Sequence, residues 1–184
     1  FIDDKYGFNF VGLRVIDANY IGAWVGGRDS TAIKGDPLYS FKGTGHGTHV
    51  AGIIGAVNGN GKGVSSIAGG TGNNDGVRLM ACQIFTDKNP TDAQRAAAYI
   101  YAADNGACIA QCSYGQPDKL TTDELYTNQF PLEKAALDYF LDKSNSNHPA
   151  LDGNIAVFAA GNHSNPYSIY PGALTECISV TSFG

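Results

Sequence analysis

Helix signals and strand signals alternate along the chain from residue 46 onward, and this alternation limits the possible folds more than any other feature. Apolar side chains recur at intervals of three and four residues, the spacing of a helix with one buried face, in residues 46–57, 89–106 and 131–140. Short runs that are almost entirely apolar, as in buried parallel strands, occupy residues 77–85, 107–113, 155–160 and 177–181. The alternation predicts a doubly wound α/β fold, with a mainly parallel sheet and helices on both faces.

Local signals indicate where these helices begin and end. Asn89 and Pro90 are expected to cap and open the second helix. Asn105 and Gly106 are expected to end it, and Pro131 opens the third helix. The apolar spacing predicts three inner faces, made of Val50, Ile53, Ile54 and Val57, of Ala96, Ala97, Ile100 and Tyr101, and of Leu132, Ala135, Ala136, Tyr139 and Phe140.

Length, charge and hydropathy narrow the class of protein. The 184 residues suffice for one hydrophobic core and contain no linker, so residues 1–184 are expected to form part of a single domain. The 12 Lys and Arg residues are scattered and outnumbered by 17 Asp and Glu residues, which argues against a nucleic-acid partner. No apolar run approaches the ~18 residues of a membrane span. Phe1 is neither an initiator methionine nor part of a signal peptide, so we expect an artificial boundary or a cleavage site there.

Four cysteines stand inside apolar segments, at Cys82, Cys108, Cys112 and Cys177. Buried cysteines that act as small hydrophobic residues have this setting, whereas disulfide frameworks are typical of much shorter secreted chains. Cys108 and Cys112 also lack the Cys-x-x-Cys spacing of structural zinc sites. The sequence therefore predicts free thiols and no zinc site.

Residues 45–52 read Gly-His-Gly-Thr-His-Val-Ala-Gly and place His46 at the start of the first predicted helix. Glycines on both sides leave its imidazole uncovered, and a histidine beside a cleft is well suited to act as a general base near neutral pH. His46 and His49 also have the spacing of a metal pair, but no glutamate follows at metalloprotease spacing. From these residues alone His46 is a candidate general base, with a structural histidine as the alternative.

A second candidate group follows the strand predicted over residues 155–160. Asn162 lies at the carboxyl end of that strand, where parallel sheets form ligand crevices. An amide in this position can donate a hydrogen bond to an oxyanion that develops during acyl transfer. Asn162 is therefore a candidate oxyanion donor, with an ordinary turn asparagine as the alternative.

The histidine segment and the Ala-Ala-Gly-Asn sequence at residues 159–162 together resemble two motifs of the subtilisin-like serine endopeptidases. The resemblance implies a catalytic domain that hydrolyses peptide bonds through an acyl-enzyme, acts on peptides or proteins, and is secreted or displayed at the cell surface. It also implies that His46 is base and then acid, that Asn162 is the oxyanion donor, and that His49 is structural and faces inward. Matching segments cover residues 1–10, 43–57, 63–85, 107–115 and 154–184, whereas residues 12–42 and 116–150 look like insertions.

The same resemblance implies two substrate-binding segments. The family's Ser-Leu-Gly strand, which binds substrate as an additional strand, is matched by Ser113, Tyr114 and Gly115, called the substrate segment below. Gly115 lets the substrate backbone approach, whereas Tyr114 replaces the usual leucine and leaves the side-chain preference open. The floor of the primary specificity pocket is expected to consist of Ala159, Ala160 and Gly161, called the pocket segment below.

Two parts of the family's catalytic machinery lack a clear match. The Gly-Thr-Ser-Met-Ala-like segment around the nucleophilic serine does not occur in the 184 residues. Residues 2–11 are similar to a segment that follows the catalytic aspartate in many bacterial members, which places that aspartate before residue 1. Asp17 is the alternative orienting acid, although Asn19 stands where the family has glycine. We therefore expect an internal piece of a protease that is inactive alone, with a non-catalytic binding or scaffold domain as the alternative.

In the family, the strand that leads to the catalytic aspartate is central in the sheet. It lies between the strands matched here by residues 77–85 and 107–113. We expect a separate polypeptide to fill this slot, either another part of the same protein or a second copy. Residues 13–17 are the alternative occupant, which would return Asp17 to a place beside His46.

Calcium is the metal that the resemblance suggests, because family members often carry it on loops. Asn58 and Asn60, and also Asp3 and Asp4, offer hard oxygen ligands, although turn residues explain them equally well. The hydrolysis itself is expected to require no cofactor.

Overall fold

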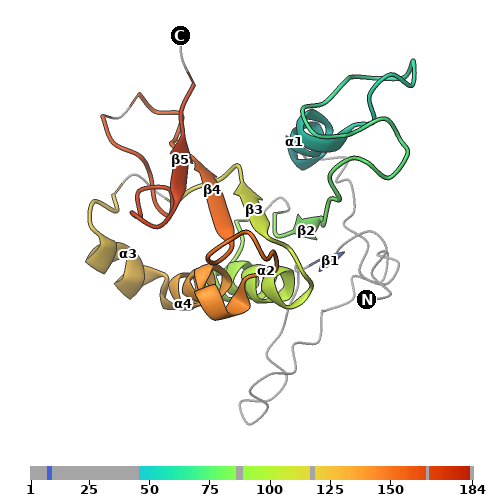
Figure 1. Ribbon diagram of the computed structural model, residues 1–184. Helices are drawn as coiled ribbons and strands as arrows, with labels where there is room; N and C mark the ends of the chain where they lie inside the picture. Colours follow the sequence, from blue (N-terminus) through green and yellow to red (C-terminus); the bar gives the residue numbers. More distant parts are fainter. Residues whose placement is uncertain (1–7, 10–45, 86–88, 117–118, 165, 183–184) are drawn as a thin grey trace, which may run out of the picture.

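The computed structural model describes residues 8–9, 46–85, 89–116, 119–164 and 166–182 (Figure 1). The larger sheet has three parallel strands in the order β3 (Ile109–Cys112), β4 (Ile155–Ala159) and β5 (Ile178–Val180). A second parallel pair consists of β1 (Phe8–Asn9) and β2 (Cys82–Gln83). The parallel sheet with its helices confirms the predicted α/β class. Each of the four predicted strands is present, although it is shorter than its apolar run.

The helices are α1 (His46–Gly55), α2 (Asp92–Asp104), α3 (Asp123–Gln129) and α4 (Pro131–Leu141), followed by the 3-10 helix η1 (Lys143–Asn145). α3 and α4 lie between β3 and β4, where two parallel strands require a crossover connection. α2 and α4 pack side by side against the three-stranded sheet (Figure 1). None of the helices in the described part of the chain is long and apolar enough to cross a membrane.

The hydrophobic core lies between α2, α4 and the three-stranded sheet. Successive residues of β4 alternate between half-buried and buried, and Ala156 and Phe158 are the buried ones. Leu137 and Phe140 from α4 are fully buried in the same cluster. This packing fixes β3 and β4 as neighbours, which matters because the candidate site follows their ends.

The observed ends of α2 correct one prediction and confirm another. The N-cap is Thr91, two residues beyond the predicted Asn89, and α2 begins at Asp92. A capping box explains this start, because the Thr91 hydroxyl accepts from the Gln94 amide at 3.3 Å and the Gln94 side chain accepts from the Thr91 amide at 2.8 Å. The predicted end is confirmed, with Asn105 as the C-cap.

The buried faces of α2 and α4 differ in part from the predicted ones. In α2, Ala96 and Ala97 are buried as expected, and so are the unpredicted Arg95, Tyr99, Ala102 and Ala103. In α4, Ala136 and Phe140 are buried as expected, whereas Leu132, Ala135 and Tyr139 are exposed. Glu133 and Leu137 are buried instead, because α4 turns the Glu133 carboxylate toward Arg95 of α2.

The helix predicted at residues 46–57 is present as α1, but the predicted burial of its apolar face is wrong. No residue of α1 is buried, and Ile53 is 50% exposed. Among the described residues, the loop that follows α1 contacts it, and the Ile67 amide donates to the Ile53 carbonyl at 3.0 Å. Helical spacing specified the helix without supplying a packing partner for its apolar face.

The predicted gap in the sheet is partly tested. β2 pairs with β1 and β3 pairs with β4, and within the described residues β2 and β3 belong to separate sheets. Side chains beyond the two strand ends do meet, since the Phe85 and Tyr114 ring centroids lie 5.6 Å apart. Direct pairing of the two strands is therefore not observed. Residues 13–17 lie outside the described residues, so the occupant of the gap stays a prediction.

The four cysteines confirm the predicted free thiols. Cys112 is buried and the other three are partly buried. Burial raises the pKa of Cys82, Cys112 and Cys177 to about 12. These thiols stay protonated near neutral pH and are poor nucleophiles. Among the described residues, no group of three or more His, Cys, Asp or Glu side chains could hold a metal ion.

Candidate active site

The substrate segment and the pocket segment follow neighbouring parallel strands. Cys112 at the end of β3 stands opposite Phe158 of β4, so Ser113 and Ala159 come next on adjacent strands. Asn162 comes three residues after the end of β4 and is exposed. The structure therefore brings these predicted groups together at the carboxyl ends of the strands, where parallel sheets bind ligands. This end of the sheet is called the sheet edge below.

A loop over residues 166–172 is hydrogen-bonded to the pocket segment and to the residue that follows the substrate segment. The amide of Ile169 donates to the Ala160 carbonyl at 3.0 Å, and the amide of Gln116 donates to the Tyr170 carbonyl at 2.7 Å. The ring of Tyr170 stacks on Tyr126 of α3 with centroids 5.2 Å apart. The loop thus bridges the edge of the sheet and is itself held by α3.

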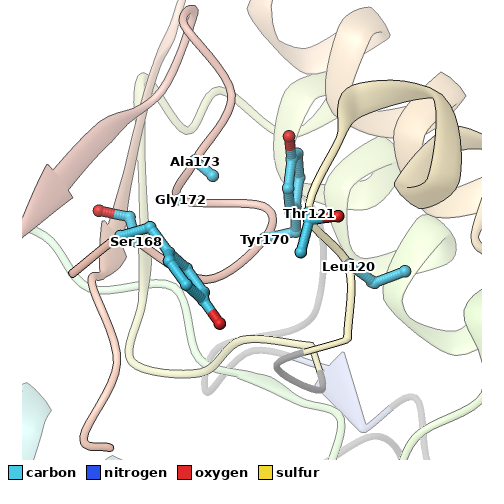
Figure 2. A pocket seen from close by; sticks show the side chains of 7 residues that line it. Leu120, Thr121, Ser168, Tyr170, Gly172 and Ala173 are labelled. Carbon is cyan, nitrogen blue, oxygen red and sulfur yellow. The ribbon is translucent and has the colours of Figure 1, made fainter. Parts of the chain in front are cut away.

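The same loop forms one wall of a cavity of about 400 Å³. Its lining residues are Leu120, Thr121, Tyr167, Ser168, Tyr170, Gly172 and Ala173. Figure 2 shows Leu120 and Thr121 on the opposite side from Ser168. None of the predicted site residues lines this cavity. It is therefore a neighbour of the predicted substrate site rather than the site itself.

A buried polar network lies directly behind the substrate segment. Its centre is Glu133 of α4, which is 0% exposed and accepts from Arg95 Nε at 2.8 Å. Gln116 Nε2 donates to the same carboxylate at 2.6 Å, and the Tyr114 hydroxyl donates at 3.3 Å. The Tyr99 hydroxyl hydrogen-bonds to that of Tyr114. The network therefore holds the side chains on both sides of Gly115.

Burial raises the pKa of Glu133 above its ordinary value, and the Arg95 guanidinium and the hydrogen bonds offset part of that rise. Burial likewise raises the pKa of Tyr114 and Tyr99 well above the ordinary tyrosine value. Periodicity alone did not identify this network, because its members come from α2, α4 and the end of β3. The one available signal was a glutamate next to the predicted apolar face of α4.

The two histidines are less firmly placed relative to this edge. His46 is the first residue of α1, as predicted, and its side chain is exposed and hydrogen-bonds to no described residue. His49 is also exposed, so the expectation that it faces inward is wrong for the described chain. The juxtaposition of His46 and Asn162 stays a prediction.

The side-chain oxygen atoms of two candidate calcium ligands already accept hydrogen bonds within turns. Asn58 Oδ1 accepts from the Ser66 amide at 2.7 Å, and Asn60 Oδ1 accepts from the Lys62 amide at 2.9 Å. Each amide oxygen retains a second lone pair. Asp3, Asp4 and Asp17 lie outside the described residues.

The small-residue segment and the amide of Asn162 thus follow the carboxyl end of a parallel strand, the place where α/β sheets commonly bind ligands. The sequence model of the Subtilase family matches residues 27–184, and the chain belongs to this family. The resemblance inferred from the histidine and asparagine motifs is thereby confirmed.

Two relatives illustrate the similarity. A "Calcium-dependent protease" of Trichormus variabilis is 32% identical over 123 residues, which cover 64% of this chain and 16% of the relative. A "Thermophilic serine proteinase" of Bacillus sp. strain AK1 is 32% identical over 137 residues, which cover 73% of this chain and 28% of the relative. The chain thus matches less than a third of the length of either relative.

Proposed function

We propose that this chain is part of a serine endopeptidase that hydrolyses peptide bonds of peptide or protein substrates through an acyl-enzyme. The observation that carries the proposal is the placement of the substrate segment and the pocket segment with Asn162 on adjacent strand ends, in a chain of the Subtilase family. An extended peptide can lie along this edge, and its scissile carbonyl then meets the amide of Asn162.

In the proposed mechanism, a serine hydroxyl attacks the scissile carbonyl carbon while His46 accepts its proton. Asn162 donates a hydrogen bond to the carbonyl oxygen as negative charge develops there. His46 then gives the proton to the leaving amine, and water hydrolyses the acyl-enzyme by the same steps in reverse order. No cofactor enters these steps.

The serine and the orienting aspartate are proposed to come from outside residues 1–184. No Gly-Thr-Ser-Met-Ala-like segment occurs in this sequence, and the described residues place no carboxylate beside His46. The remaining parts of the same protein are therefore the proposed partners of this chain. A location outside the cell or at its surface is proposed from the family resemblance alone. Measuring how much of the protein is in the culture medium and how much stays with washed cells would test it.

A second candidate is a binding or scaffold domain that keeps the fold without catalysis, since residues 1–184 contain no Gly-Thr-Ser-Met-Ala-like segment. The flanking sequence separates the two functions. An upstream Asp-Ser-Gly or Asp-Thr-Gly and a downstream Gly-Thr-Ser would support the protease, and their absence from the complete protein would support the scaffold.

The Asn162→Ala variant of the complete protease tests the proposed role of this amide. We expect kcat to fall by about 10²- to 10³-fold, the effect known from a subtilisin, with KM nearly unchanged, because the contact forms chiefly in the transition state. The measurement is steady-state hydrolysis of a peptide substrate. Asn128→Ala, a replacement of an exposed asparagine of α3, is the matched control. A raised KM with unchanged kcat would instead assign Asn162 to ground-state binding.

Calcium is proposed as a structural ion, supported by the name of the "Calcium-dependent protease" relative and by the oxygen chemistry of Asn58 and Asn60. Asp3 and Asp4 are candidate further ligands. Removal of calcium with a chelator is expected to lower the melting temperature of the protein by roughly 5–10 °C when the free calcium concentration is about 100 times the Kd of the site. An unchanged melting temperature would rule out a stabilising calcium ion.

A further inference from the structure

One side chain occupies the space between the substrate segment and the pocket segment. A Cβ atom added to Gly161 would lie 3.2 Å from Ile169 Cγ2 and 3.5 Å from Ile169 Cδ1. A Cβ atom added to Gly115 would overlap the Cδ1 and Cγ1 atoms of the same isoleucine. The Ile169 side chain therefore packs on the bare Cα atoms of both glycines, which follow the ends of β3 and β4.

The loop that carries Ile169 holds it in this position. Its amide donates to the Ala160 carbonyl at 3.0 Å, and its carbonyl accepts from the Ala173 amide at 3.1 Å. The adjacent residues Ser168 and Tyr170 line the separate cavity of Figure 2, which Ile169 does not line. Two backbone hydrogen bonds thus hold the backbone of Ile169 beside the two glycines.

Tyr170 adds a further restraint to the loop. Its hydroxyl donates to Asp123 Oδ1 of α3 at 2.6 Å, and its carbonyl accepts from the Gln116 amide at 2.7 Å. Gln116 in turn donates to the buried Glu133 at 2.6 Å. These hydrogen bonds hold the loop that carries Ile169 at the ends of the strands.

We infer that Ile169 determines specificity by filling the primary pocket, so that the protease accepts only small residues, Gly, Ala or Ser, on the acyl side of the scissile bond. This inference rests on the proposed function, because it needs the substrate segment and the pocket segment to flank that residue. A branched four-carbon side chain between two glycines leaves no depth for an aromatic or long aliphatic side chain. The size of the side chain at position 169 sets the depth of the pocket.

The test uses the complete protease and four peptide substrates that differ only in the residue before the cleaved bond, which is Gly, Ala, Leu or Phe. Single-methylene differences in a pocket change kcat/KM by about 10- to 200-fold, so the wild type is expected to prefer Ala to Phe by at least ~100-fold. In Ile169→Gly, the kcat/KM for Phe is expected to rise at least ~10-fold, with the value for Ala changed by less than ~3-fold. Ile67→Ala, at a side chain that is 89% exposed, is the control and should leave the ratio unchanged.

Ile169→Ala and Ile169→Val accompany the glycine variant, and circular dichroism reports whether each one folds. The Phe to Ala ratio is expected to rise in the order Val, Ala, Gly at position 169. Efficient cleavage after Phe by the wild type, or a ratio unmoved in every folded variant, would overturn the role of Ile169 while leaving the protease function intact. A folded complete protein that hydrolyses none of the four peptides would overturn the proposed function itself, and this inference with it.

Discussion

His46→Ala in the complete protease is expected to lower kcat by about 10⁴- to 10⁶-fold, the range observed when one member of such a triad is removed. The imidazole is the only proposed acceptor of the serine proton and the only proposed donor to the leaving amine. Its loss therefore removes both proton transfers together. The variant should fold normally, because His46 is exposed and hydrogen-bonds to no described residue.

His49→Ala is the matched control, because His49 lies about one helical turn further along α1 and is also exposed. It is expected to change kcat by less than ~10-fold, as a residue outside the proton transfers would. Both variants are compared by steady-state hydrolysis and by thermal unfolding. Equal losses of activity in the two variants, with stability unchanged, would favour a metal held by the His-x-x-His pair over a general base.

Glu133→Ala is expected to destabilise the protein by about 3–5 kcal/mol, the cost of leaving a buried charge without its partner. Arg95 would lose the carboxylate that pairs with it, and the side chains of Gln116 and Tyr114 would lose an acceptor. Arg95 lies on α2 and Glu133 on α4, so the two helices would also lose the buried ion pair that joins them. Urea unfolding of the protein measures this change.

Glu124→Ala, at an exposed position in the first turn of α3, provides the control and should cost less than about 1 kcal/mol. Joint replacement with Arg95→Met and Glu133→Leu should recover part of the loss, since an apolar pair of similar size needs no charge compensation. A Glu133→Ala variant as stable as Glu124→Ala would show that the Arg95 ion pair adds nothing to the fold.

The elements best predicted from the sequence are those with long periodic signals. α2, α4 and the three strands of the larger sheet follow directly from apolar spacing, whereas the roles of the substrate and pocket segments were implied by the family resemblance. The start of α2 was misplaced because a capping box at Thr91 outweighs the signal of Asn89 and Pro90. α3 was missed because seven residues with few apolar positions give no period.

The unpredicted parts of the site depend on contacts between distant residues. Glu133 and Arg95 lie 38 positions apart, and only the packing of α4 on α2 brings them together. Ile169 lies in a loop whose sequence shows no period, and its contact with Gly115 and Gly161 depends on how that loop crosses the sheet edge. Apolar spacing likewise could not show that no residue of α1 is buried.

Fluorophosphonate labelling, mapped by mass spectrometry, tests most directly whether residues 1–184 supply a base to a nucleophile that lies outside them. In the complete protein we expect one labelled serine, located outside this sequence, and loss of that label in His46→Ala. The 184-residue chain alone should remain unlabelled, because isolated members of a triad retain little of its effect. A stoichiometrically labelled serine within residues 1–184, or labelling that does not depend on His46, would contradict this assignment.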